Sequence, residues 1–283
     1  IDRLLFAEAT LTSGLETNGS SLVDEKLGYY NPDEDVHYGN RLIADQETST
    51  QAAFLQSEWK IGKMILSAGL RYDHYNIKEK SENNDDINGD VFSPRISLLY
   101  NITNHFQFRT GYAQGFRTPQ IYDEDLHIET SAARTVIHEN AQDLKQESSN
   151  SITASMDYSN HFGNWQFQAL LEGFYTQLTD PFANTYGEPD ENKTIIYTRI
   201  NAEDGAVVNG INIELNASPS NNFQIQSGLT FQKSEYETAQ KFNKKSFLRT
   251  PGTYGYVSMN YSPAQVLNIA LTGNYTGSML VPY

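Results

Sequence analysis

The chain has 283 residues, of which 38% are hydrophobic and 12% aromatic, and its formal net charge is −15. The excess of Asp and Glu argues against nucleic acid as a partner, because phosphate binding needs clustered Lys and Arg, and the absence of cysteine excludes disulfides, thiol catalysis and Cys-ligated zinc. No stretch approaches the roughly 18 continuous apolar residues of a membrane helix, which leaves membrane β-barrels open, since these carry apolar residues at every second position.

Segments in which apolar and polar residues alternate recur along the chain and predict about eleven β-strands. In chain order they cover residues 3–12, 48–60, 64–76, 93–100, 105–117, 149–158, 165–178, 194–217, 223–232, 254–261 and 266–276. Alternation slips near Glu203-Asp204-Gly205, and we expect the eighth segment to be one strand with a bulge at that point.

The connections between these segments alternate between long and short. Residues 13–47 form a long polar stretch that we expect to be an irregular loop, whereas Ile61-Gly62-Lys63 is a tight turn. An up-and-down membrane barrel has this arrangement, with short periplasmic turns and long external loops. Each segment also has one aliphatic and aromatic face and one polar face. The sequence therefore predicts an all-β, antiparallel, up-and-down transmembrane β-barrel; an antiparallel sheet with one solvated face is the alternative.

The run Gly115-Phe-Arg-Thr-Pro-Gln-Ile-Tyr-Asp-Glu-Asp-Leu-His-Ile128 resembles a signature of TonB-dependent outer-membrane receptors. Other runs resemble the same family in order and spacing: Phe54-Leu-Gln-Ser-Glu-Trp59, Gly69-Leu-Arg-Tyr-Asp73, Ser93-Pro-Arg-Ile-Ser97, Leu144-Lys-Gln-Glu147, Tyr175-Thr-Gln-Leu-Thr-Asp-Pro-Phe182, Asn209-Gly-Ile-Asn-Ile-Glu-Leu215 and Thr276-Gly-Ser-Met-Leu-Val-Pro282. The resemblance covers nearly the whole chain. Because such transporters have about 22 strands, it implies that residues 1–283 are a partial, incomplete barrel domain without a plug domain.

The resemblance also implies function and partners. The expected function is binding and import of a scarce ligand through the outer membrane of a Gram-negative bacterium, by default a ferric siderophore or a similar iron or cobalamin complex. The expected partners are outer-membrane lipid, the TonB energy-coupling complex reached through a plug, a small-molecule ligand and, as a further candidate, a surface lipoprotein. A secreted or surface β-rich binding or adhesion protein without transport is the alternative.

Catalysis is not expected, because the motifs G-x-S-x-G and H-E-x-x-H are absent. Asp123 and Asp125 with His127 could serve as acid–base partners, so an outer-membrane hydrolase is kept as a second alternative. The same loop group, with Tyr122, is the predicted ligand contact, together with Arg117, where the family signature places an arginine at the upper lumen. A solvated acidic loop is the ordinary interpretation of such a cluster.

Two further groups complete the predicted site. Asp33 and Asp35, in a second acidic loop, are candidates for calcium, a hard cation that carboxylate oxygens satisfy. The residues expected to face the lumen or a plug are Arg71, Arg95, Arg109, Glu58, Glu172 and Glu214. Ion pairing within the wall, without a ligand role, is the alternative for these six.

Overall fold

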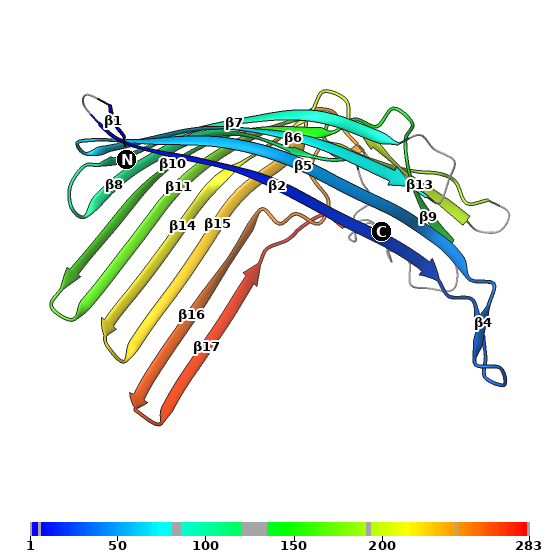
Figure 1. Cartoon of the computed structure of the whole chain (residues 1–283). Helices are drawn as coiled ribbons and strands as arrows, with labels where there is room; N and C mark the ends of the chain where they lie inside the picture. Colours follow the sequence, from blue (N-terminus) through cyan, green and yellow to red (C-terminus); the bar gives the residue numbers. More distant parts are fainter. Residues whose placement is uncertain are drawn as a thin grey trace.

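The computed structural model shows a long, curved antiparallel sheet shaped like a trough (Figure 1). The structure describes residues 2–4, 7–80, 86–119, 135–190, 194–240 and 243–281. Twelve strands form the main sheet in the order β1-β2-β5-β6-β7-β8-β10-β11-β14-β15-β16-β17. Their bounds are β1 Asp2–Leu4, β2 Ala7–Lys26, β5 Arg41–Ile61, β6 Met64–Glu79, β7 Ile87–Asn101, β8 Phe106–Arg117, β10 Glu147–Phe162, β11 Trp165–Thr179, β14 Ala206–Ser220, β15 Phe223–Tyr236, β16 Thr253–Ala264 and β17 Leu267–Thr276. No helix among the described residues is long and apolar enough to cross a membrane.

Two smaller sheets belong to the long connections. The hairpin of β3 (Tyr29–Asn31) and β4 (Val36–Tyr38) projects from the end of the trough between β2 and β5 (Figure 1). A three-stranded sheet contains β9 (Thr135–Asn140), β12 (Phe182–Tyr186) and β13 (Thr194–Asn201), with β9 parallel to β13. The end of the trough with these long connections is called the loop end below, and the opposite end is called the turn end.

The turns at the turn end follow the local sequence. Gly62 and Gly163 are the first of two turn residues, and both have positive φ, +59° and +64°. This is the type II′ arrangement, whose twist matches that of the joined strands. The β14–β15 and β16–β17 turns lack a glycine of positive φ, and there the register shifts at residues 217–220 and 261–264. Such a bulge restores the local twist.

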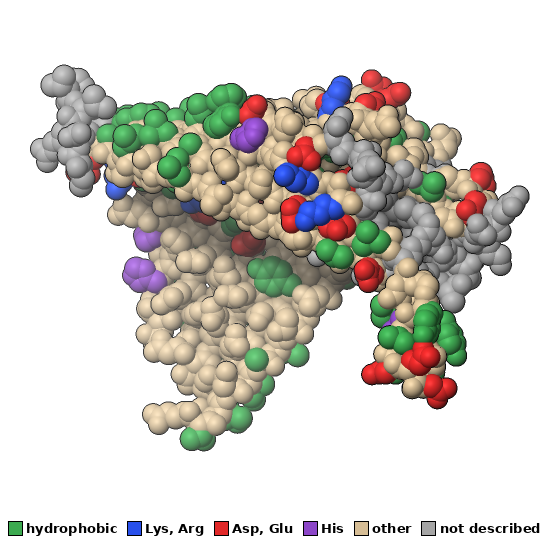
Figure 2. Space-filling model, turned by 45° about the vertical axis from the view of Figure 1, so that its right-hand side comes forward, with side chains coloured by type: hydrophobic (Ala, Val, Ile, Leu, Met, Phe, Trp, Pro, Cys, Tyr) green, Lys and Arg blue, Asp and Glu red, His purple; other side chains and the backbone are tan. Residues whose placement is uncertain are grey.

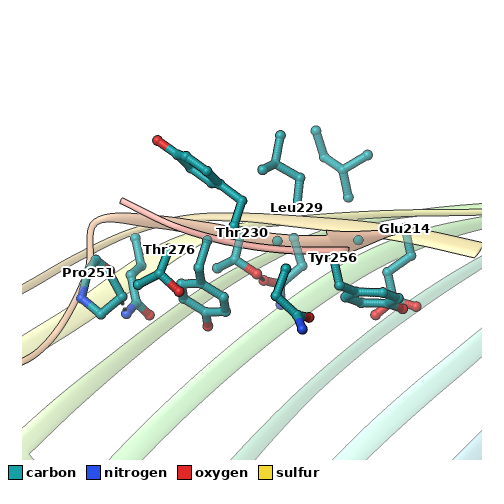
Figure 3. Close-up of a pocket in the computed structure, with 14 residues that line it drawn as sticks. Glu214, Leu229, Thr230, Pro251, Tyr256 and Thr276 are labelled. Atoms are coloured by element: carbon teal, nitrogen blue, oxygen red, sulfur yellow. Dashed lines mark hydrogen bonds between the residues drawn. The ribbon is translucent and has the colours of Figure 1, made fainter. Parts of the chain in front are cut away.

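The register separates two chemically different faces. Directly paired residues lie on the same face of a sheet, and Leu55 pairs with Leu70 while Tyr72 pairs with Phe92. Leu229 lies on this convex side, whereas Glu214 and Tyr256 lie on the concave side (Figure 3). Figure 2 shows hydrophobic side chains gathered on the convex face. Those that are exposed there include Leu11, Leu55, Leu70, Ile96, Ile152, Leu171, Ile211 and Leu271. An apolar face of this extent suits contact with lipid.

Aromatic residues mark two levels on the convex face. Near the turn end, the rings of Phe223 and Tyr261 lie 6.2 Å apart, and near the loop end those of Tyr72 and Phe92 lie 5.1 Å apart. Phe231 follows Phe223 by eight residues on β15, which is about 27 Å along a strand and roughly 20 Å along the axis of a barrel with strands tilted by about 40°. This separation matches the apolar band of outer-membrane barrels, about 25 Å tall and flanked by aromatic girdles.

The predicted all-β meander is confirmed, with eleven long strands plus the short β1, in an open sheet. Several predicted bounds are wrong: residues 3–12 are divided between β1 and β2, and β7 begins at Ile87, before the predicted residue 93. Two larger errors concern residues 13–47 and 194–217. Residues 13–47 are not an irregular loop, because β2 continues to Lys26 and β5 begins at Arg41. In this part of the sheet both faces are polar, as in Thr17-Asn18-Gly19-Ser20, so hydrogen bonding continues where alternation has ended.

The second error concerns residues 194–217, which are not one bulged strand. β13 belongs to the loop-end sheet, and the wall strand β14 begins at Ala206. Asp204 and Gly205, both with positive φ, form the turn between them. The alternation of long and short connections still holds, because β13 lies within a long connection and is not a wall strand.

Candidate ligand-binding site

All six residues predicted to face the lumen lie on the concave face. Glu58 on β5 pairs with Ser67 on β6, and Gly69, two residues from Ser67 and on the same face, pairs with Arg95 on β7. The register carries this face onward across the sheet to the remaining four, Arg71, Arg109, Glu172 and Glu214. The period-two pattern thus located these side chains, although it did not say which of them contact one another.

Arg71 forms the strongest ion pair of the concave face. Its Nε lies 2.9 Å from both carboxylate oxygens of Asp73, and its Nη1 lies 2.7 Å from Glu16 Oε2. Asp73 is only 1% exposed, so its charge requires this guanidinium. Because Glu16 is on β2, the contact also ties together β2 and β6 across the intervening β5.

Arg95 reaches across a glycine. Gln56, Gly69 and Arg95 stand side by side on β5, β6 and β7, and Arg95 donates a hydrogen bond to Gln56 Oε1. A Cβ on Gly69 would lie 3.2 Å from Arg95 Nε, so the glycine leaves the space through which the long side chain crosses. Its partner is a neutral amide, and the positive charge of Arg95 is therefore not neutralised by this contact.

The remaining charges make weaker contacts or none. Asn212 donates to Glu172 Oε1 at 2.9 Å and accepts from Thr230 Oγ1 at 2.9 Å, which links β11, β14 and β15. Ser67 Oγ lies 3.4 Å from Glu58. Within the described part of the chain, Arg109 and Glu214 have no hydrogen bond or ion pair. Cross-strand ion pairing thus holds for Arg71 but not for the other two lumen arginines.

Arg117 lies at the loop end against an aromatic ring. Its Cζ is 5.7 Å from the centre of the Phe182 ring, and Arg199 Cζ is 5.3 Å from the same centre. Arg199 comes from β13 and is only 7% exposed, whereas Phe182 begins β12. A guanidinium group near an aromatic ring is attracted by the ring quadrupole, and Phe182 has two such neighbours. We call Arg117, Phe182 and Arg199 the arginine–phenylalanine cluster.

Two further contacts hold this cluster to the wall. Phe182 N donates to Glu147 Oε2 at 3.0 Å, and Tyr236 Oη donates to the Phe182 carbonyl at 2.9 Å. Glu147 pairs directly with Arg117 between β10 and β8. Glu147 and Phe182 lie in runs that resemble the receptor family, yet their role was missed, as was that of Arg199, because only the folded loops bring these residues together.

Asn201 joins two long connections. Its side chain accepts from Lys145 N at 2.8 Å and donates to the carbonyls of Lys145 and Asp180 at 3.0 and 2.7 Å. The segment before β10 is thereby held to the segment after β11. This contact places the three-stranded sheet and the arginine–phenylalanine cluster in a fixed position over the wall.

A cavity of about 740 Å³ lies against the far sector of the sheet, β14 to β17. Glu214, Thr230, Tyr256, Pro251 and Thr276 lie on its concave side (Figure 3). Its other polar lining residues include Asn212, Gln232 and Asn274. These are amides, hydroxyls and phenols, so this cavity offers many hydrogen bonds but, apart from Glu214, no charge.

The predicted calcium residues lie in the projecting hairpin, which carries hydrophobic and acidic side chains (Figure 2). Tyr30 Oη donates to Asp35 Oδ1 at 2.6 Å, and Tyr38 Oη donates to Glu34. These hydrogen bonds to carboxylates raise the pKa of Tyr30 and of Tyr38 above its usual range. No group of three or more His, Cys, Asp or Glu positioned for a metal occurs among the described residues. Calcium binding at Asp33 and Asp35 stays a prediction.

Tyr122, Asp123, Asp125 and His127 lie outside the described residues. They follow Arg117 and Pro119 in the chain. Their predicted contact with a ligand stays a prediction.

Comparisons with known proteins agree with this architecture. Residues 4–281 match the family model described as TonB dependent receptor-like, beta-barrel. An iron-regulated outer membrane virulence protein of Vibrio cholerae serotype O1 is 24% identical over 240 residues, which cover 82% of this chain and 34% of the relative. The chain thus spans about a third of the length of the curated relatives that it matches.

Solved structures share the fold. The ferric-catecholate import receptor Fiu from K12 E. coli is 18% identical with a TM-score of 0.65, over 96% of this chain and 42% of that one. The siderophore receptor PiuA from Acinetobacter baumannii is 14% identical with a TM-score of 0.67, over 97% and 44%. The resemblance found in the sequence is confirmed by the family match over nearly the whole chain: the protein belongs to the TonB-dependent receptors, as part of their β-barrel in the outer membrane of a Gram-negative bacterium.

Proposed function

We propose that this chain is the wall segment of a receptor that takes up an anionic ferric chelate, a siderophore complex, at the cell surface. The relative from Vibrio cholerae is named as iron-regulated, and two solved structures of the same fold are named as a ferric-catecholate import receptor and a siderophore receptor. These names support iron as the cargo.

The observation that carries the proposal is the arginine–phenylalanine cluster at the loop end, which is the extracellular end of the barrel. Arg117 and Arg199 flank Phe182 there in a chain whose net charge is −15. Guanidinium groups bind planar anionic oxygens in bidentate geometry, and aromatic rings add apolar contact area. Catecholate and carboxylate chelates of ferric iron present such oxygens on an aromatic or compact body. The predicted contacts Tyr122, Asp123, Asp125 and His127 remain part of the proposal.

The other partners follow from this role. Lipid covers the convex face, a plug domain fills the concave side, and the plug carries the contact with the TonB energy-coupling complex. In this proposal Glu58, Glu172, Glu214 and Arg109 contact the plug. Binding and gated passage need no bond-making chemistry, so no catalytic activity is assigned. A surface lipoprotein stays a predicted additional partner.

The experiment is uptake of radiolabelled iron by cells that carry or lack the receptor containing this chain. Ferric catecholate, ferric hydroxamate, haem and labelled cobalamin are offered in separate cultures, with and without a functional TonB protein. We expect TonB-dependent uptake of the ferric catecholate to disappear in the deletion strain. Unchanged uptake of all four would contradict the proposal and favour a surface binding or adhesion protein.

A variant tests the cluster itself. Arg117→Gln should weaken binding of the ferric catecholate by about thirtyfold or more, since loss of one member of a hydrogen-bonded charge pair costs about 2 kcal/mol or more. Lys233→Gln is the matched control, because Lys233 is an exposed cation on the convex face, whose ion pair among the described residues is with Glu235 at 2.8 Å. Equal affinity of the two variants would remove the cluster from the binding site.

A further inference from the structure

One sector of the concave face is basic. The concave sides of β7 and β8 carry Arg95, Arg109 and Arg117 and no Asp or Glu. Arg71 follows on β6, where Asp73 and Glu16 neutralise it. By contrast, the concave sides of β15, β16 and β17 carry no charged residue. The adjoining β10 carries Glu147 and Asp157 on its concave side, so the excess of positive charge is confined to β7 and β8.

The arginines follow one another from the loop end to the turn end. Arg71 pairs with Ser93 of β7, Arg95 lies two residues further along β7, and Arg109 pairs with Leu99, four residues further again. At about 3.4 Å per residue these steps are about 7 and 14 Å. Arg117 extends the row beyond Arg71 to the arginine–phenylalanine cluster, since Ala113 pairs with Arg95 and Arg117 lies four residues further along β8.

The wall is hollowed beside this row. Two adjoining cavities of about 300 and 410 Å³ share Arg95 and Ala113. Their concave-side lining is otherwise made mainly of small side chains: Ser67, Gly69, Ser93, Ser97, Gly111 and Ser151. Hydroxyl groups and glycines leave the guanidinium groups as the largest polar groups along the sector.

Two of these arginines keep an unbalanced charge among the described residues. The hydrogen-bond partner of Arg95 is the neutral Gln56, and Arg109 has no hydrogen bond or ion pair with another described residue. A surface lined by one sign of charge attracts and concentrates ions of the opposite sign. Successive guanidinium groups a short distance apart offer an anion a series of equivalent contacts, which is the condition for binding that also permits departure.

We propose that the anionic chelate travels along this sector of the wall, from the arginine–phenylalanine cluster past Arg71 and Arg95 to Arg109, when the receptor is energised. The inference rests on the proposed function for the identity of its cargo. It adds the route: passage follows the concave side of β7 and β8, beside Arg71 of β6, and the uncharged sector of β15 to β17 is not part of it.

The first test fills the hollow without touching the binding cluster. Gly111→Leu is suitable because a Cβ at this position meets the nearest atoms at an ordinary 3.4 Å or more, and Ala113→Leu is its neighbour. In the receptor containing this chain, both should lower energised uptake of radiolabelled ferric catecholate severalfold while its binding affinity at the surface stays unchanged. The matched control is Asn274→Leu, on the concave face of β17, which should leave uptake unchanged.

A second pair of variants distinguishes the effect of side-chain charge from the effect of side-chain size. Arg95→Gln should lower uptake, and Arg95→Lys should retain most of it, again without a change in affinity. Uptake that is insensitive to Gly111→Leu and Ala113→Leu, or equally sensitive to Asn274→Leu, would overturn the route.

The second test needs no ligand and so distinguishes a wrong route from a wrong cargo. The chain has no cysteine, so Ser151→Cys and Asn274→Cys each introduce one cysteine into this part of the wall, and the parent receptor gives the background. In energised cells, a thiol reagent bearing a sulfonate should modify Ser151→Cys faster than one bearing a trimethylammonium group, and Asn274→Cys should lack this preference. The same charge preference at both positions, or at neither, would overturn the proposal even if iron uptake is confirmed.

Discussion

Two sectors of the concave wall differ in what their glycines make room for. The first sector comprises β6 to β8 with the arginines, and the second comprises β14 to β17. On β6, Gly69 makes room for Arg95 to cross toward Gln56. On β15, Gly228 lies under Tyr256, whose Cε1 would be 2.4 Å from an added Cβ. One glycine thus admits a mobile charged group and the other is covered by a ring, an arrangement known to support glycines in sheets. The first sector is therefore built to hold charge, and the second is built to pack side chains against the sheet.

The largest effect is expected from the charge network of the first sector. Asp73→Asn should lower the free energy of unfolding by about 2 kcal/mol, because removing one member of a buried ion pair leaves the other charge uncompensated; Arg71 keeps Glu16 and is partly exposed, which limits the loss. Glu214→Gln is the control in the other sector and should be nearly neutral. Urea unfolding of the receptor in detergent, followed by tryptophan fluorescence, measures both. Equal losses of unfolding free energy in the two variants would mean that a carboxylate charge stabilises both sectors to the same extent.

The two glycines provide the next effect. Gly228→Ala should destabilise the barrel by about 1–2 kcal/mol, since the Tyr256 ring must move, and overpacking of this kind costs about 1–3 kcal/mol. Gly69→Ala should cost less, because its nearest neighbour is the flexible side chain of Arg95 at 3.2 Å. The same unfolding measurement gives both values. A larger loss for Gly69→Ala would reverse the assignment of packing to the second sector.

A single hydrogen bond gives a smaller effect in the second sector. Thr230→Val removes the donor to Asn212 Oδ1 and should cost about 1 kcal/mol, the net value of a typical hydrogen bond. Thr110→Val is the comparison on the convex face, where Thr110 Oγ1 donates to the Thr153 carbonyl at 2.9 Å. If Thr230→Val is neutral, the link from β11 through β14 to β15 does not stabilise this sector.

The smallest effect is expected in the β3–β4 hairpin, which lies outside both sectors of the wall. The pKa of Tyr30 and of Tyr38 is raised in the folded hairpin by bonds to Asp35 and Glu34. Their contribution to hairpin order is fully present below the ordinary tyrosine value of about 10 and is lost as pH rises through the higher folded pKa. An ultraviolet titration of phenolate should therefore show one late-titrating phenol fewer in Tyr30→Phe, and likewise one fewer in Tyr38→Phe. Titration at the ordinary value in the parent would contradict these bonds.

Much of the wall could be predicted from sequence because lipid imposes the pattern. A lipid-facing position must be apolar, so period-two alternation marks each strand within the apolar band, and a turn such as Ile61-Gly62-Lys63 marks its end. Outside that band the constraint disappears. The outer half of β2 and the start of β5 therefore could not be recognised, although their backbone hydrogen bonds continue.

The arginine–phenylalanine cluster could be predicted only in part. Arg117 lies in a recognisable run and on the expected face. Phe182 and Arg199 come from separate strands of a sheet in which β13 pairs in parallel with β9, and the paired residues Thr135 and Thr194 are 59 positions apart. Such a pairing depends on how the long connections fold, and it produces no local periodic pattern in the sequence from which it could be predicted. Period-two alternation predicted which residues face the lumen. It did not predict their hydrogen-bond partners, because these depend on which side chains are long enough to reach across a neighbouring glycine.

The Asn201 contacts have a consequence for how ligand preference changes among related receptors. Because one side chain holds the connection before β10 to the connection after β11, neither connection is an independent module. A segment grafted from another receptor between β8 and β10 would arrive without its partner between β11 and β14. Exchange of specificity in this barrel should therefore require both segments to be inherited together, and homologous recombination that separates them should leave a receptor that inserts correctly and recognises nothing.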